Sequence, residues 1–190
     1  MSDPVTALNH ARYDGYVAVQ EIGPQGMITL RGDLLSQGLR DVVSGLTAGD
    51  IPSRGGVVVT GHTACCWMSP DELLLLLPYD AVSGALADIA SSLAASHHLA
   101  VDVSDARAVF RVTGPLLREV LAKLTPADVS PAMLSSGQLR RTRLGQVPAA
   151  FYLRDAETVE IICFRSVAQY VFDLLPNAAR PGGEVGLFRS

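Results

Sequence analysis

The chain has 190 residues, of which 48% are hydrophobic and only 18% are charged, and its formal net charge is -4. A chain of this length buries about 70% of the surface that its unfolded form exposes, so it needs no disulfide or metal ion to fold. Because soluble domains average about 25% charged residues, the sparse charge predicts that other proteins cover part of the surface. The acidic balance and the single lysine, Lys123, argue against a nucleic-acid partner.

The N-terminal residues, Met1 to Pro4, lack the basic and apolar regions of a signal peptide, and no window holds 18 apolar residues. The three cysteines are Cys65, Cys66 and Cys163, and two of them are adjacent, so they cannot form a disulfide framework. We therefore expect a cytoplasmic protein without a membrane partner.

The chain shows irregular ends around a patterned centre. Residues 1–25 and 179–190 are rich in glycine and proline and lack periodicity, so we expect an N-terminal and a C-terminal tail. Helical spacing of apolar residues predicts four helices, at about 35–46, 82–93, 116–124 and 167–175. Alternating or β-branched runs predict strands at about 27–31, 56–60, 99–103, 108–113, 138–144, 149–153 and 159–164.

The run of five leucines from Leu73 to Leu77 is ambiguous. Propensity favours a helix that begins at Ser69 to Glu72, but Pro78 closes the run too early for a helix of normal length. An internal repeat favours a strand, because the run corresponds to the β-branched segment 159–162 in the second half.

The repeat also predicts the fold. A strand ending in Gly32, a helix and the segment 46–51 in the first half correspond to a strand ending in Gly114, a helix and the segment 124–129 in the second. We expect an α+β fold with two pseudo-symmetric, split-βαβ-like halves, at about 26–97 and 98–178, in a single domain over 26–178.

Few residues suggest chemistry. No glycine-rich nucleotide motif occurs, and His62 with Cys65 and Cys66 lacks a fourth zinc ligand, so two small buried cysteines on a strand are the simpler interpretation. The pairs Asp71–Glu72 and Asp102–Asp105 are nominal acid/base candidates. Neighbours on a strand point to opposite faces, so we do not expect Asp71 and Glu72 to share a site.

Basic residues give no clear site either. His97 and His98 are expected at a helix end, in a capping or surface role. Arginines are numerous in the second half and could bind carboxylate or phosphate groups, but solvated strand faces and subunit salt bridges are the simpler roles. They are Arg107, Arg111, Arg140, Arg141, Arg143 and Arg165. We assign no catalytic, cofactor-binding or metal-binding residue.

Several segments, in order, resemble the gamma subunit of heterotetrameric sarcosine oxidase. They are Ile28 to Leu34, Trp67 to Leu74, Asp102 to Arg107, Gly114–Pro115 with Val120 to Ala122, Asp128–Val129, Gly137 with Thr142, and Phe164 to Ala168. The resemblance covers roughly residues 26 to 178. It implies a fold similar to the folate-binding domain of aminomethyltransferases.

The resemblance implies an accessory, non-catalytic subunit of a complex that oxidises sarcosine to glycine, with hydrogen peroxide and 5,10-methylenetetrahydrofolate as further products. The implied partners are alpha, beta and delta subunits. These would carry FAD, FMN, NAD, the tetrahydrofolate site and zinc, and this chain would bind none of them.

Two alternatives stay open at this stage. One is a free-standing folate-binding protein like the iron-sulfur assembly relatives, whose Lys-Gly-Cys motif is replaced here by Ser136-Gly137-Gln138. The other is a small-ligand regulatory module built from the same sheet-and-helix units, which predicts a self-sufficient dimer.

Overall fold

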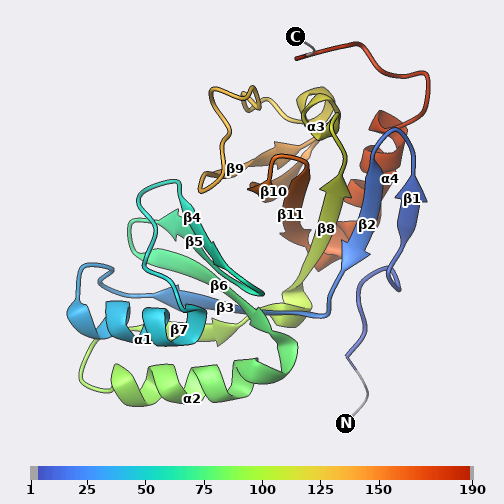
Figure 1. The fold of residues 1–190 in the computed structure, drawn as a ribbon. Helices are drawn as coiled ribbons and strands as arrows, with labels where there is room; N and C mark the ends of the chain where they lie inside the picture. Colours follow the sequence, from blue (N-terminus) through green and yellow to red (C-terminus); the bar gives the residue numbers. More distant parts are fainter. Residues whose placement is uncertain (1–3, 189–190) are drawn as a thin grey trace. The chain divides into compact units, whose positions relative to one another are not determined.

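The computed structural model describes residues 4–188, which divide into two compact units (Figure 1). One unit is the continuous segment 25–105. The other joins the described residues of segments 1–24 and 106–190, so residues 4 and 188 belong to the same unit. Each unit consists of one β-sheet and two α-helices.

The unit formed by residues 25–105 contains a five-stranded sheet in the order β4-β5-β6-β3-β7, with every neighbouring pair antiparallel. Its elements are β3 (Gln25–Arg31), α1 (Gln37–Thr47), β4 (Val57–Thr60), β5 (Thr63–Ser69), β6 (Glu72–Pro78), α2 (Val82–Ser92) and β7 (Leu99–Asp102). The helices α1 and α2 share a core with one face of this sheet, and Leu30, Leu39, Leu75 and Ile89 lie at its centre.

The other unit contains a six-stranded antiparallel sheet in the order β1-β2-β8-β11-β10-β9. Its elements are β1 (Arg12–Asp14), β2 (Ala18–Ile22), β8 (Arg107–Thr113), α3 (Leu117–Leu124), β9 (Leu139–Leu144), β10 (Val147–Asp155), β11 (Thr158–Phe164) and α4 (Ala168–Ala178). Phe110, Phe151 and Ile161 pack with residues of α3 and α4, such as Val120 and Val171, in the core of this unit.

The leucine run from Leu73 to Leu77 forms β6, as the repeat predicted, and all five leucines are buried. It pairs with β3 on one side and β5 on the other, so it is a central strand. Central position explains why the run shows no polar alternation, since both faces of such a strand can be covered.

The N-terminal segment differs from the irregular tail expected from the sequence, because it contains β1 and β2. The latter lies beside β8, with Val19 opposite Val112. The expected halves also differ from the observed units. β7 begins at Leu99, inside the segment expected to start the second half, yet it pairs with β3 of the other unit. Local periodicity carries no information about which sheet a strand joins, and this explains both differences.

Two buried glutamates hold the irregular end segments to their unit. The carboxylate of Glu21 accepts hydrogen bonds from the backbone N–H groups of Leu8 and His10, at 2.9 and 3.1 Å. Glu119 accepts hydrogen bonds from the backbone N–H groups of Val185 and Gly186. In the described part of the chain, no helix is long and apolar enough to cross a membrane.

Candidate functional site

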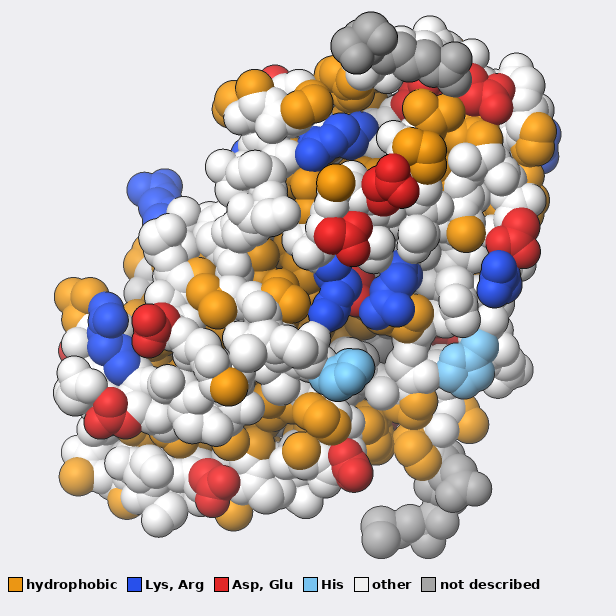
Figure 2. Space-filling model, viewed as in Figure 1, with side chains coloured by type: hydrophobic (Ala, Val, Ile, Leu, Met, Phe, Trp, Pro, Cys, Tyr) orange, Lys and Arg blue, Asp and Glu red, His pale blue; other side chains and the backbone are white. Residues whose placement is uncertain are grey.

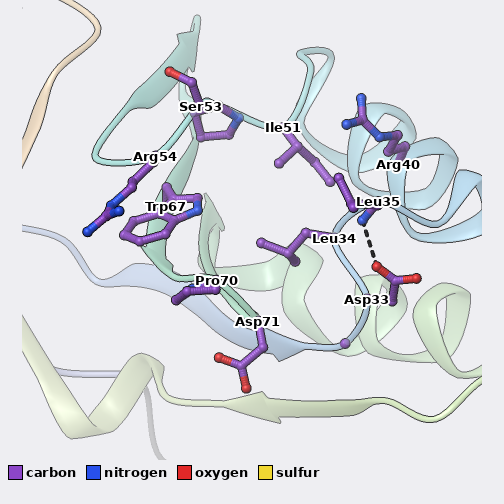
Figure 3. Close-up of a pocket in the computed structure, with 12 residues that line it drawn as sticks. Asp33, Leu34, Leu35, Arg40, Ile51, Ser53, Arg54, Trp67, Pro70 and Asp71 are labelled. Atoms are coloured by element: carbon purple, nitrogen blue, oxygen red, sulfur yellow. Dashed lines mark hydrogen bonds between the residues drawn. The ribbon is translucent and has the colours of Figure 1, made fainter.

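A pocket of about 710 Å³ lies in the unit formed by residues 25–105 (Figure 3). Its lining comes from the loop after β3, the first turn of α1, the loop before β4, strand β5, and the turn between β5 and β6. The lining residues are Gly32, Asp33, Leu34, Leu35, Arg40, Ile51, Pro52, Ser53, Arg54, Trp67, Pro70 and Asp71.

The pocket has an apolar interior and a charged rim. Trp67 lies across it from Leu34 and Ile51, and the guanidinium groups of Arg40 and Arg54 lie on opposite sides and point outward (Figure 3). Leu35 is 81% exposed, which is unusual for leucine. An apolar interior between charges of both signs suits the binding of a side chain or small molecule. The lining contains neither histidine nor cysteine, so it offers no familiar nucleophile-base pair.

Local backbone contacts shape the wall of the pocket. The N–H of Gly32 donates to the carbonyl of Asp71 at 3.0 Å, which ties the loop after β3 to the turn before β6. A Cβ atom on Gly32 would lie 2.9 Å from a terminal methyl carbon of Leu39, so the Leu39 side chain would have to shift. Asp33 accepts a hydrogen bond from the N–H of Leu35. The helix α1 begins at Gln37, with Ser36 as its N-cap residue, so Asp33 shapes the loop and does not cap the helix.

Asp71 and Glu72 share a partner, contrary to the expectation from strand alternation. Arg31 contacts Asp71 at 3.3 Å and Glu72 at 2.5 Å through its two terminal nitrogens. Asp71 lies in the turn before β6, so the alternation of strand residues does not apply to it. A hydrogen bond from Ser69 and the charge of Arg31 lower the pKa of Asp71, and desolvation opposes them. This arrangement keeps Asp71 charged and is unsuited to a general acid.

The other acidic candidates, Asp102 and Asp105, have separate structural partners. Asp102 accepts hydrogen bonds from the backbone N–H and the hydroxyl of Ser104, at 2.9 and 2.6 Å. Asp105 accepts a hydrogen bond from the Tyr79 hydroxyl at 3.2 Å. These contacts fix the chain between β7 and β8, and they do not bring the two carboxylates onto one reacting group.

The residues considered as zinc ligands, His62, Cys65 and Cys66, do not point toward a common site. Cys65 and Cys66 are buried neighbours on β5, whereas His62 is exposed in the turn before that strand. Burial raises the pKa of the Cys65 thiol to about 12. Within residues 4–188, no group of three or more histidine, cysteine, aspartate or glutamate side chains could hold a metal ion.

His97 and His98 were expected at the end of a helix, but they lie beyond the end of α2. α2 ends at Ser92, and His97 and His98 lie in the loop that leads to β7. The Nδ1 atom of His98 is 3.0 Å from the carbonyl oxygen of Ser96, a local contact within this loop.

The arginines of the second half have varied roles. The guanidinium of Arg107 lies 5.1 Å from the centre of the Phe164 ring. Arg140 donates to the carbonyl of Met133, and Arg165 donates to the carbonyls of Val5 and Thr6, both at 3.0 Å. Arg111, Arg141 and Arg143 lie on strands β8 and β9.

The sequence did not reveal a buried ionic cluster on β8, β10 and β11. Glu160 is 2% exposed and accepts hydrogen bonds from Arg111 at 2.6 Å, Tyr152 at 2.5 Å and Arg154 at 3.3 Å. A glutamate inside the apolar strand 158–164 was a possible signal, because a buried charge requires partners. The pocket was also missed, since its walls come from segments distant in sequence.

Apolar side chains also reach the surface outside the pocket. Figure 2 shows hydrophobic side chains scattered over the face in view, with charged side chains of both signs between them. Besides Leu35, the exposed large hydrophobic residues include Leu99 and Val101 on the edge strand β7, Met133, Phe164 and Val185. This surface agrees with the sparse charge of the sequence.

Comparison with known proteins identifies relatives. The model of the "Sarcosine oxidase, gamma subunit family" matches residues 31–180. A sarcosine oxidase subunit gamma from Arthrobacter sp. is 28% identical over 73% of this chain and 68% of its own length. Another, from Corynebacterium sp. (strain P-1), is 27% identical over 86% of this chain and 80% of its own.

Solved structures support the fold. A chain of the heterotetrameric sarcosine oxidase from Corynebacterium sp. U-96 superimposes with a TM-score of 0.79, at 24% identity, over 88% of this chain and 87% of that one. The glycine cleavage system aminomethyltransferase T from Bartonella henselae gives a TM-score of 0.61, at 14% identity, over 85% of this chain and 45% of that one. These likenesses confirm an α+β fold similar to that of aminomethyltransferases. Because the family model covers most of its length, this chain belongs to the sarcosine oxidase gamma subunit family and functions as a subunit of that oxidoreductase.

Proposed function

We propose that the chain is the small accessory subunit of a heterotetrameric sarcosine oxidase and performs no chemistry of its own. The match of the family model over residues 31–180 carries this proposal. The complex would demethylate sarcosine oxidatively to glycine, with hydrogen peroxide and 5,10-methylenetetrahydrofolate as further products. It would work in the cytoplasm.

The cofactors of the complex would lie in the other subunits. We propose that the alpha, beta and delta subunits carry FAD, FMN, NAD, the tetrahydrofolate site and zinc. The separate partners of Asp71, Asp102 and Asp105 support a non-catalytic chain, because each carboxylate is engaged in holding a turn or loop.

We also propose that the two units arose by duplication, with an exchange of one strand. Each unit runs strand, helix, three-stranded meander, helix, and the order β4-β5-β6-β3-β7 corresponds to β9-β10-β11-β8-β2. The strand written last in each order directly precedes, along the chain, the strand that begins the strand-helix pattern of the other unit. β7 precedes β8, and β2 precedes β3. This equivalence supports the duplication.

A second candidate function is a free-standing folate-binding or small-ligand regulatory protein of the same fold. The pocket of about 710 Å³ favours it, because that volume falls in the range of small-molecule sites. Calorimetry with tetrahydrofolate separates the two candidates. We expect no measurable binding to the isolated chain, and micromolar affinity would favour the second candidate.

Co-expression tests the first candidate. The chain should be poorly soluble alone and should co-elute with the other subunits when expressed together, because apolar surface left in water favours aggregation. A soluble monomer that fails to co-elute, and whose thermal midpoint does not change with the partners present, would contradict the proposal.

A variant with alanine at Asp71, Glu72, His62 and Cys65 tests for chemistry in this chain. We expect it to support sarcosine turnover at the wild-type rate per assembled complex. Wild-type assembly combined with lost turnover would assign a catalytic role to one of these residues.

A further inference from the structure

The walls of the pocket are fixed by hydrogen bonds within the chain. The N–H of Trp67 donates to the carbonyl of Gly56 at 3.0 Å, and the N–H of Gly56 donates to the carbonyl of Ser53 at 2.8 Å. On the other side, the hydroxyl of Ser36 donates to the carbonyl of Asp33 at 2.8 Å. A site whose loops are already ordered loses little conformational entropy when it is filled.

The unsatisfied charges at the rim of the pocket are positive. Asp71 forms an ion pair and Asp33 accepts a backbone hydrogen bond, so both carboxylates have partners in the chain. Arg40 and Arg54 are exposed, and their guanidinium groups have no hydrogen-bond or ion-pair partner within residues 4–188. They lie on opposite sides of the pocket and point outward (Figure 3), so they can bind acidic groups that lie beyond its mouth.

The apolar interior of the pocket is suited to a hydrophobic side chain from another molecule. Trp67, the only tryptophan of the chain, lies across from Leu34 and Ile51 (Figure 3). Tryptophan and arginine are the residues that most often dominate the binding energy of protein interfaces. Leu35 also lines the pocket and is 81% exposed. A molecule enclosed by the pocket would leave much of Leu35 in water, whereas a protein segment laid across the mouth would cover it.

We propose that the pocket docks a segment of another subunit of the complex, in which an apolar side chain inserts between Trp67 and Ile51 and acidic side chains on either side of it bind Arg40 and Arg54. This inference rests on the proposed function, because it requires partner subunits. Guanidinium groups bind carboxylates through paired hydrogen bonds, and opposite charges across an interface fix its register. A neutral or basic segment would leave both guanidinium groups unpaired at the interface, so an acidic one is the match.

Charge removal at the rim is the first test. The double variant Arg40→Gln/Arg54→Gln removes both positive charges, and Arg143→Gln/Arg180→Gln is the matched control, with the same change of charge at exposed positions outside the pocket. Each is co-expressed with the other subunits, and release of this chain is followed by native mass spectrometry as salt is raised. We expect the rim variant to dissociate at least about tenfold more readily than wild type at low salt, with the difference shrinking at high salt.

Each result of this titration decides the inference. Equal stability of the rim variant and the wild type would overturn it, as would an equal or larger effect of the control. If wild-type chain does not assemble at all, the proposed function fails instead, so the two failures are distinguishable.

Cross-linking is the second test and identifies the docked segment. The chain contains one lysine, Lys123, so Arg40→Lys/Arg54→Lys introduces amines at the rim while it preserves the charge. In the assembled complex, a carbodiimide should join both amines to aspartate or glutamate side chains of another subunit. The two cross-linked acidic residues should flank an apolar residue in the sequence of that subunit. The variant Arg143→Lys/Arg180→Lys is the control and should give fewer such cross-links.

The cross-links also separate the other possible occupants of the pocket. Assembly of the rim variant without a cross-link to another subunit at both positions, or with links only to Asp33 and Asp71 of the same chain, would contradict the docking. Equal yields from the rim variant and the control would contradict it as well. A small molecule recovered in stoichiometric amount with this chain, in place of the cross-links, would assign the pocket to a ligand and overturn the inference.

Discussion

Glu119 in α3 and Val185 near the C-terminus are joined by a hydrogen bond of 2.6 Å from the backbone N–H of Val185 to the Glu119 carboxylate. The same carboxylate accepts the N–H of Gly186 and lies 3.4 Å from the ammonium of Lys123. Lys123 in turn donates to the carbonyls of Ala178 and Gly183. One buried glutamate therefore fastens an irregular segment that would otherwise extend from the unit.

The variant Glu119→Gln should loosen this C-terminal segment. An amide cannot accept the two backbone hydrogen bonds as strongly as a carboxylate, and it loses the charge opposite Lys123. We expect a loss of about 1–3 kcal/mol in the free energy of unfolding, measured with urea on the assembled or solubilised chain. Faster proteolysis within residues 180–188 should accompany it. Glu157→Gln, at an exposed turn, is the control and should change neither property.

The contribution of Glu119 should depend on pH in a defined direction. Desolvation raises its pKa, but hydrogen bonds from Val185 and Gly186, together with Lys123, outweigh it and hold the pKa below the ordinary value of 4.5. The unfolded chain therefore binds a proton at higher pH than the folded chain does. The stabilisation is complete above about pH 4.5 and is lost as the pH falls through the lower, folded value.

The comparison of wild type with Glu119→Gln isolates this effect from that of other carboxylates. The difference in unfolding free energy should be constant between pH 6 and 8 and should shrink steadily as the pH is lowered toward 3. A difference that grows on acidification would show that Glu119 has a raised pKa and is not stabilised as an anion.

The sequence predicted the helices well because each has one apolar face with helical spacing. The segment 82–93 corresponds to α2 (Val82–Ser92), and 116–124 corresponds to α3. β6 was identifiable only through the repeat, because its five leucines have no alternation. β1 and β2 escaped detection because they are short, lie among glycines, and gain stability from pairing, β1 with β2 and β2 with β8. Which sheet a strand joins depends on tertiary packing, and local propensity does not encode it.

Site prediction from sequence was limited for a related reason. The pocket combines Gly32, Ile51 and Trp67, which come from three separate segments. Arg31 bridges Asp71 and Glu72 although strand alternation would separate them, because Asp71 lies in the turn that precedes β6. Proximity of this kind arises from turns and register, and no spacing rule predicts it.

The three cysteines should be unreactive in the folded protein. Cys65, Cys66 and Cys163 are at most 2% exposed, and desolvation raises the pKa values of Cys65 and Cys163 to about 12. Since the thiolate is the reactive form, an aromatic disulfide reagent at pH 8 should label none of them within minutes. In denaturant it should label all three. Rapid labelling of one thiol in the native state would show local opening around its strand.

Glu160 should be essential for the stability of the six-stranded sheet. Its buried carboxylate contacts Arg111, Arg154 and Tyr152. Glu160→Gln removes the anionic partner that Arg111 and Arg154 share on a partly desolvated face. Loss of one partner from a buried ion pair typically costs about 3–5 kcal/mol. We expect a destabilisation toward that range, since the arginines retain some exposure to water.

The variant Tyr152→Phe is the matched comparison, because it removes the hydrogen bond from the tyrosine hydroxyl to the same carboxylate and keeps both ion pairs. It should cost about 1.5–3 kcal/mol, less than Glu160→Gln. The double variant should be less destabilised than the sum of the two single variants, because both remove the same Tyr152–Glu160 contact. Urea denaturation followed by circular dichroism gives all three values. Strict additivity, or a Glu160→Gln variant as stable as wild type, would show that water already replaces these contacts and that the cluster does not hold the sheet together.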